Sequence, residues 1–229
     1  MREAIMDVKL IVRLVITFAV FAAMIFVPAG TINWVAGWVF LGLMIVYAAF
    51  SLTQLSKHNP DVIEERKGII KEDQKTWDKV FTVVITVVYL GWIIFLPIDA
   101  VRLKLSLVPL WAQIIGGILM MAGFYLVHIV AMENAYLSRT VRIQDERGHQ
   151  VIDTGPYAMV RHPMYVGVIV IFPGMALLLG SGWGALVGVI LALAFPLRII
   201  GEERMLREEL AGYVEYTERV RHRLIPGVW

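Results

Sequence analysis

Cysteine is absent from all 229 residues of the chain. This absence excludes disulfides, thiolate metal sites, cysteine nucleophiles and S-palmitoylation. Histidine is scarce, and none of the five has the HxxxH or HxxE spacing of a metal-binding motif. We therefore expect no bound metal.

Charged residues are also few. They make up 17% of the chain, against 59% hydrophobic residues, and the formal net charge is only +2. A composition this apolar is unusual for a soluble domain, and no basic segment stands apart to suggest nucleic-acid binding.

Long apolar runs are what the sequence has instead. Several approach or exceed the roughly 18 residues that a membrane-crossing helix needs. The runs are 10–28, 34–55, 80–98, 110–132, 166–179 and 183–200, and the last two are joined at Gly180-Ser181-Gly182. We expect an all-α polytopic membrane protein with about six transmembrane or membrane-embedded helices.

The distribution of positive charge predicts how these helices are oriented. Of the 21 lysines and arginines, only Arg102 and Lys104 fall in the alternate connections. The positive-inside rule therefore places both termini and the 56–79 loop in the cytoplasm. Val62, Ile63, Ile69, Ile70 and Trp77 suggest short interfacial helices in that loop, although a solvated connector is an equal alternative.

Two C-terminal features carry more polar chemistry than a membrane connector needs. In "DTGPYAMVRHPMYVG" (153–167), a turn and Pro163 precede a new helix and present Tyr157, Arg161, His162 and Tyr165 at its mouth. A helix N-terminus with these donors suits an anionic ligand, although the same residues could anchor the helix among lipid headgroups.

The second feature follows the last apolar run. Arg198 and Glu202 lie four residues apart, so they either form a stabilising helical pair or serve a site. A hairpin of the last two spans would return them to the level of Arg161 and His162. Beyond them, "EERMLREELAGYVEYTERV" (202–220) has helical periodicity and predicts a C-terminal amphipathic helix.

These residues together resemble a known family. "HQVIDTGPYAMVRHPMYVG", "RIIGEERML" and "YVEYTERV" are similar to the isoprenylcysteine carboxyl methyltransferases, which are related to the phospholipid N-methyltransferases. The resemblance is specific from Gln144 to about Val220. It implies that residues 1–137 form the N-terminal transmembrane helices and that residues 138–229 form the methyltransferase core, which binds S-adenosylmethionine at the cytoplasmic face.

The resemblance also implies roles for individual residues. Arg198 matches an arginine directed toward the substrate, with Arg161 beside it, and Glu202 matches a glutamate that contacts the cofactor. Gln144 matches a cofactor-contacting glutamine if the intervening loop is two residues shorter than in the family. The other matching cofactor-binding positions are His149, Gln150, Val151, Ile152, Tyr157, His162, Pro163, Met164 and Tyr165.

A methyl acceptor that reaches a membrane-embedded enzyme is expected to be lipid-soluble. A carboxylate acceptor needs orientation but no base, whereas an amine must lose a proton to a group such as Glu202, Glu203 or Glu133. Isoprenylcysteine-like O-methylation is the preferred reading, and the short chain suggests a prokaryotic inner-membrane enzyme. The alternatives within enzymes are phospholipid N-methylation and a membrane reductase. Outside enzymes, the alternative is a transporter or scaffold, and that class would place polar groups in mid-membrane.

Overall fold

The computed structural model describes residues 8–66 and 74–229, and the part of the chain that it describes is helical, without strands. The predicted interfacial segment around Ile69 and Ile70 lies outside the described residues. The helices, in chain order, are α1 (Val8–Ala29), α2 (Val35–His58), α3 (Pro60–Glu65), α4 (Thr76–Pro97), η1 (Ile98–Arg102), α5 (Leu110–Glu133), η2 (Asp145–Arg147), η3 (Gly155–Ala158), α6 (Pro163–Leu178), α7 (Gly182–Ala192), α8 (Phe195–Glu209) and α9 (Tyr213–Arg219).

Among the residues that the structure describes, four helical stretches are long and apolar enough to cross a membrane: Val35–His58, Thr76–Arg102, Leu110–Glu133 and Gly182–Glu209. Val15–Ala29 and Pro163–Leu178 are shorter apolar helices. Many large apolar side chains on these helices are exposed, as the lipid-facing surface of a membrane protein requires. The expected all-α polytopic membrane fold is confirmed.

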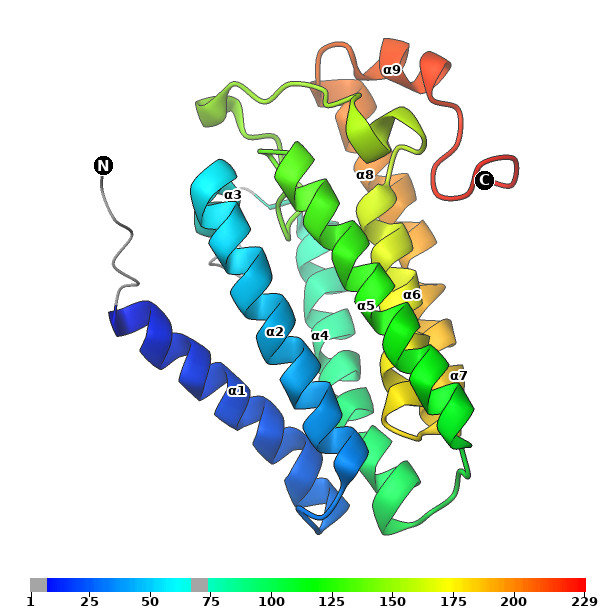
Figure 1. Ribbon diagram of the computed structural model, residues 1–229. Coiled ribbons are helices and arrows are strands. Elements are labelled where there is room, and N and C mark those ends of the chain that lie inside the picture. The colour runs from blue at the N-terminus through cyan, green and yellow to red at the C-terminus, as the bar shows by residue number, and fades with distance from the viewer. Residues whose placement is uncertain (1–7, 67–73) are drawn as a thin grey trace.

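Of the described helices, α5 and α6 pack against each other most extensively, and Figure 1 shows them side by side. They approach so closely at Gly123 and Gly167 that a Cβ added to either residue would lie 2.7–2.8 Å from the backbone oxygen of the other. Glycine permits this approach because it has no side chain, as at many helix contacts inside membranes. The contact fixes the end of α5 relative to the start of α6, where the polar residues gather.

The last predicted span is interrupted rather than continuous to Ile200. Helix α7 ends at Ala192, and α8 begins at Phe195 with Pro196 in its first turn. Proline has no N–H to continue the hydrogen bonding of the preceding helix and is favoured where a helix begins. Arg198 therefore lies in the first turn of a separate helix.

The expected C-terminal helix is also two helices. Helix α8 ends at Glu209, and Gly212 has a φ of 81°, a left-handed conformation that breaks the helix before α9. Leu206, Leu210 and Tyr213 still pack together, with Tyr216 and Val220, against the segment between α5 and α6. In Figure 1, that segment, the end of α8 and α9 all lie at the same end of the bundle, hereafter the polar end.

Candidate active site

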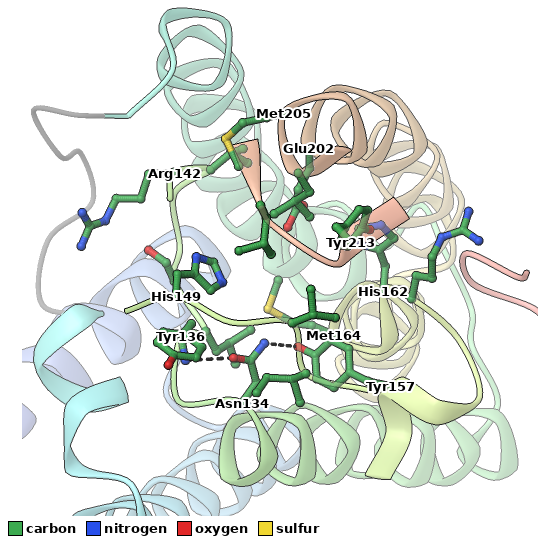
Figure 2. A pocket seen from close by; sticks show the side chains of 18 of the residues that line it. Asn134, Tyr136, Arg142, His149, Tyr157, His162, Met164, Glu202, Met205 and Tyr213 are labelled. Atoms are coloured by element: carbon green, nitrogen blue, oxygen red, sulfur yellow. Dashed lines mark hydrogen bonds between the residues drawn. The ribbon is translucent and has the colours of Figure 1, made fainter. Parts of the chain in front are cut away.

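A cavity opens at the polar end between the segment after α5, the start of α6 and helices α8 and α9 (Figure 2). We call it the first cavity. It encloses about 820 Å³ of empty space, part of which is open to solvent. Among the residues that line it are Asn134, Tyr136, Ser138, His149, Gln150, Val151, Ile152, Tyr157, Arg161, His162, Met164, Tyr165, Arg198, Glu202, Met205 and Tyr213.

All of the predicted site residues line this cavity except Gln144 and Pro163. Pro163 is buried in the first turn of α6, where its fixed φ suits the start of a helix. The buried amide of Gln144 donates to the carbonyl of Tyr136 at 2.6 Å and accepts from Arg147. Gln144 therefore lies behind the cavity lining and holds the segment that carries Tyr136 in place.

Two adjacent aromatic rings, tilted against each other, form one wall. The rings of Tyr136 and His149 lie 4.5 Å apart, and the guanidinium of Arg147 lies 5.5 Å from the centre of the Tyr136 ring. Burial, reinforced by the positive charge of Arg147, lowers the pKa of His149 to about 4. The imidazole is therefore neutral at physiological pH, and its Nδ1 faces the backbone N–H of Gln144 at 3.4 Å.

Tyr157 is held rigidly at the base of the cavity. Its hydroxyl accepts from Asn134 Nδ2 at 2.8 Å, and its carbonyl accepts from the hydroxyl of Tyr216 at 2.8 Å. The first of these contacts is drawn in Figure 2. These bonds join the end of α5, the η3 turn and α9 around one side chain, so α9 closes the cavity.

The hydroxyl of Tyr213 differs from that of Tyr157 in its hydrogen bonding. Among the described residues, its hydroxyl is the one buried side-chain polar atom without a hydrogen-bond partner. Burial of an unpaired hydroxyl is unfavourable, and such groups in native structures usually have a ligand, ion or water to explain them. Because Tyr213 lines the first cavity, a polar ligand there would satisfy its hydroxyl.

Glu202 presents the carboxylate in the cavity wall. Its Oε2 accepts from the hydroxyl of Tyr165 at 2.7 Å, while its Oε1 has no hydrogen bond within the described part of the chain. The two alternative bases lie elsewhere. Glu133 accepts from Thr154 outside the cavity lining, and Glu203 is occupied by ion pairs.

Arg198 is not paired with Glu202. Its Nε lies 2.7 Å from Asp78 Oδ1, and a second nitrogen donates to Asp78 Oδ2 at 3.2 Å and to the carbonyl of Arg139 at 2.6 Å. Asp78 is fully buried in the first turn of α4. Sequence analysis missed this residue, although an acidic residue two positions before the apolar run 80–98 was a signal for it.

Arg161 and His162 belong to a buried cluster around Glu203. Arg161 contacts Glu203 at 2.6 Å and donates to the carbonyls of Val220 and Arg221 at 2.7 and 2.8 Å. His162 Nε2 lies 3.3 Å from Glu203, and Arg223 pairs with the same carboxylate at 2.9 Å. The cluster ties α6, α8 and the C-terminal segment together.

A second cavity lies beside the first, with about 810 Å³ of empty space, part of which is open to solvent. The two share four lining residues: Ser138, Met164, Tyr165 and Arg198. The rest of the second cavity is formed by Arg66, Arg139 and the mainly apolar faces of α4, α6 and α8, through Phe81, Thr82, Ile85, Thr86, Val168 and Phe195. The shared residues therefore separate a polar compartment from a largely apolar one.

No group of three or more potential metal-ligating side chains occurs among the described residues. The polar chemistry of both cavities is that of hydroxyl, amide, carboxylate, imidazole and guanidinium groups.

Comparison with known proteins agrees with the resemblance seen in the sequence. Residues 111–211, from α5 to just beyond α8, match the phospholipid methyltransferase family. The fold is similar to the solved structure of the eukaryotic intramembrane Ras methyltransferase ICMT (isoprenylcysteine carboxyl methyltransferase), with a TM-score of 0.54 and 21% sequence identity over 92% of this chain and 75% of that one. No curated protein sequence matches significantly. These likenesses support a membrane methyltransferase.

Proposed function

We propose that the protein transfers a methyl group from S-adenosylmethionine, held in the first cavity, to a lipid-soluble acceptor that enters the second cavity from the membrane. The observation that carries this proposal is the shared wall between the two cavities. Donor and acceptor would arrive from different phases and meet at Met164, Tyr165 and Arg198. Holding two reactants in line can remove about 7–11 kcal/mol of the barrier to such a transfer.

The residues of the first cavity suit this cofactor. Tyr136 and His149 offer aromatic surface for an adenine ring. The free Oε1 of Glu202 and the unpaired hydroxyl of Tyr213 suit the ribose hydroxyls and the ammonium and carboxylate of the methionyl part. We therefore assign cofactor binding to these residues together with Gln150, Val151, Ile152, Tyr157, His162, Met164 and Tyr165, with Gln144 and Pro163 as supports.

The preferred acceptor is a carboxylate, as in isoprenylcysteine-like O-methylation. S-adenosylmethionine supplies an electrophilic methyl group, so the carbon–sulfur bond breaks as the oxygen–carbon bond forms and a neutral thioether is left. A carboxylate has no proton to lose, so the protein needs only to orient it and exclude water. We assign orientation to Arg198, because its remaining nitrogen has no partner within the described residues and lies at the shared wall.

Phospholipid N-methylation is the second candidate. The family match favours it, and so does the hydrogen bond from Tyr165 to Glu202. An amine acceptor must release a proton, and this pair leads from the shared wall to a carboxylate that can take it. The same arrangement works with either acceptor, so the product must decide between them.

The polar end is assigned to the cytoplasm. The lysines and arginines of the chain gather at the connections on that side, and the positive-inside rule retains such loops in the cytoplasm. S-adenosylmethionine would then reach the first cavity directly, without crossing the membrane.

The test is cofactor titration and methyl transfer with Glu202→Gln. Loss of a hydrogen bond to a charged group is worth about 1.5–3 kcal/mol, so affinity for S-adenosylmethionine should fall about 10- to 100-fold. Glu208→Gln is the matched control, because Glu208 is exposed on the same helix and does not line the cavity. Equal affinity in both variants would contradict the assignment of Glu202.

The bond formed identifies the acceptor. Transfer of radiolabelled methyl groups to an S-prenylated cysteine should give a product that releases methanol in base, as a carboxyl methyl ester does. A base-stable product formed only with an amine-bearing phospholipid would support N-methylation instead.

A further inference from the structure

Two arginines of the second cavity have no role in the chemistry proposed above. Arg66 follows α3, and Arg139 lies in the segment after α5. Within the described part of the chain, neither guanidinium has a hydrogen bond or a carboxylate partner. The other arginines near the site are paired: Arg142 with Glu65, Arg161 with Glu203 and Arg198 with Asp78.

Their environment disfavours two uncompensated positive charges. Arg66 is half-buried, and its pKa is lowered first by burial and then by the positive charge of Arg139. Like charges in a partly desolvated place raise the free energy of the empty site. A bound anion would remove this repulsion, and two guanidinium groups suit phosphate oxygens, which they contact in a bidentate manner.

The position of the two arginines separates them from the methyl transfer. Both line the second cavity and neither lines the first, whereas Arg198 and Tyr165 line both. An anion at Arg66 and Arg139 is therefore a different group from the one that faces the cofactor. The same cavity carries the apolar side chains of Phe81, Ile85, Val168 and Phe195, which can accommodate hydrocarbon.

We propose that Arg66 and Arg139 form an anion site that binds a phosphate group on the acceptor lipid, apart from the group that receives the methyl. The acceptor is then an anionic amphiphile, with phosphate at the two arginines, hydrocarbon along α4 and α6, and the reactive group at the shared wall. An S-prenylated cysteine supplies the hydrocarbon and the reactive carboxylate but no phosphate, so it should bind more weakly than an acceptor that also carries phosphate. The identity of the reactive end rests on the proposed function, whereas the anion site rests on the arginines alone.

The test measures binding of dihexanoyl phosphatidic acid to the purified full-length protein below the micelle concentration of the lipid. Dihexanoylglycerol has the same chains without phosphate, and inorganic phosphate lacks the chains. We expect the phosphate-bearing lipid to bind at least about tenfold more tightly than either. Arg66→Gln and Arg139→Gln should each abolish most of that difference, and Arg66→Lys should restore part of it because an ammonium lacks the guanidinium fork.

Arg207→Gln is the control, since Arg207 is an exposed arginine of α8 that lines neither cavity. It should bind the lipid as the unaltered protein does. The two site variants should also unfold at an unchanged or higher temperature, because they relieve repulsion and break no ion pair. Unchanged lipid affinity in both site variants would overturn the proposal, and so would equal binding of inorganic phosphate and the lipid.

Titration with S-adenosylmethionine separates this proposal from the proposed function. The arginine variants should bind the cofactor normally, because neither residue lines the first cavity. Arginine-dependent lipid binding in a protein without affinity for the cofactor would uphold the anion site and refute the methyltransferase proposal. If the protein binds the cofactor but its lipid binding does not depend on the arginines, the anion site would be refuted and the methyltransferase proposal would stand.

Discussion

At the scale of single residues, the charged groups near the first cavity divide into those that build it and those left free for a ligand. Asp78 and Arg198 neutralise each other in a buried place, as Arg161 and Glu203 do. Removing one partner of a buried pair leaves an uncompensated charge, at a cost of about 3–5 kcal/mol. Arg198→Ala would therefore test folding as much as turnover, whereas Glu202 and Tyr213 can be altered with little loss of structure.

Tyr213→Phe separates a ligand-binding role from a structural one. The variant removes an unpaired buried hydroxyl, so the free energy of unfolding without cofactor should rise, by about 1–3 kcal/mol. Affinity for S-adenosylmethionine should fall at the same time, because the bound cofactor loses its hydrogen bond to the hydroxyl. Denaturation and calorimetry give the two numbers. A variant that is destabilised and binds normally would show that the hydroxyl has only a structural role.

His149 predicts a dependence of stability on pH. Its pKa is about 4 in the folded protein and 6.5 in an unpaired histidine, so the unfolded chain binds more protons between these values. The stability that His149 contributes is fully present above pH 6.5 and is lost as the pH falls toward 4. His149→Gln should flatten this part of the profile. Profiles that are superimposable from pH 7 to pH 4 would contradict the burial of a neutral imidazole.

At the scale of elements, the contact between α5 and α6 sets the geometry of the site. Asn134 lies just beyond the end of α5, and α6 begins at Pro163, two residues before Tyr165. The close approach at Gly123 and Gly167 holds these ends together. Each also meets bulky side chains, Ile171 and Val127, that fill the interface on either side.

Gly123→Ala should therefore disturb both the bundle and the site. The new Cβ would lie 2.7 Å from the carbonyl oxygen of Gly167, a backbone atom that cannot move without separating the helices. Overpacking of this kind costs about 1–3 kcal/mol, and cofactor affinity should fall with it. Gly91→Ala is the matched control, since its new Cβ would have no atom within 4 Å beyond its chain neighbours and the backbone of its own helix, and alanine favours a helix. Equal melting temperatures for the two variants would contradict this account of the interface.

The sequence could predict the helices and most of the cavity lining, because apolar runs and local turn signals act over short distances. Sequence reasoning missed the break between α7 and α8 and the one at Gly212, because the apolar and amphipathic patterns continue across both, although Pro196 and Gly212 were local signals for them. It also missed Asp78, whose partner Arg198 lies 120 residues away in the chain. Tyr213 was within a recognised motif but was read only as part of the apolar face of a helix, and Tyr216, in the same motif, was given no role.

At the scale of the whole molecule, polar chemistry is concentrated at one end of a lipid-facing bundle. Figure 1 shows long helices running from this end to the other, with α9 lying over the end of α8 and the C-terminal segment beside it. A transporter would place its binding groups midway along the bundle. Here the two cavities meet at the polar end, which suits a reaction between a water-soluble donor and an acceptor dissolved in the membrane.

The most direct test of this account is the thermal stability of the purified, folded protein with and without S-adenosylmethionine. At a hundredfold excess over the dissociation constant, the cofactor should raise the free energy of unfolding by about 2.7 kcal/mol. The rise should persist in the presence of a chelator, because we expect no metal to take part. Identical unfolding curves at millimolar cofactor, in protein shown to be folded, would contradict the central claim that the first cavity is a cofactor site.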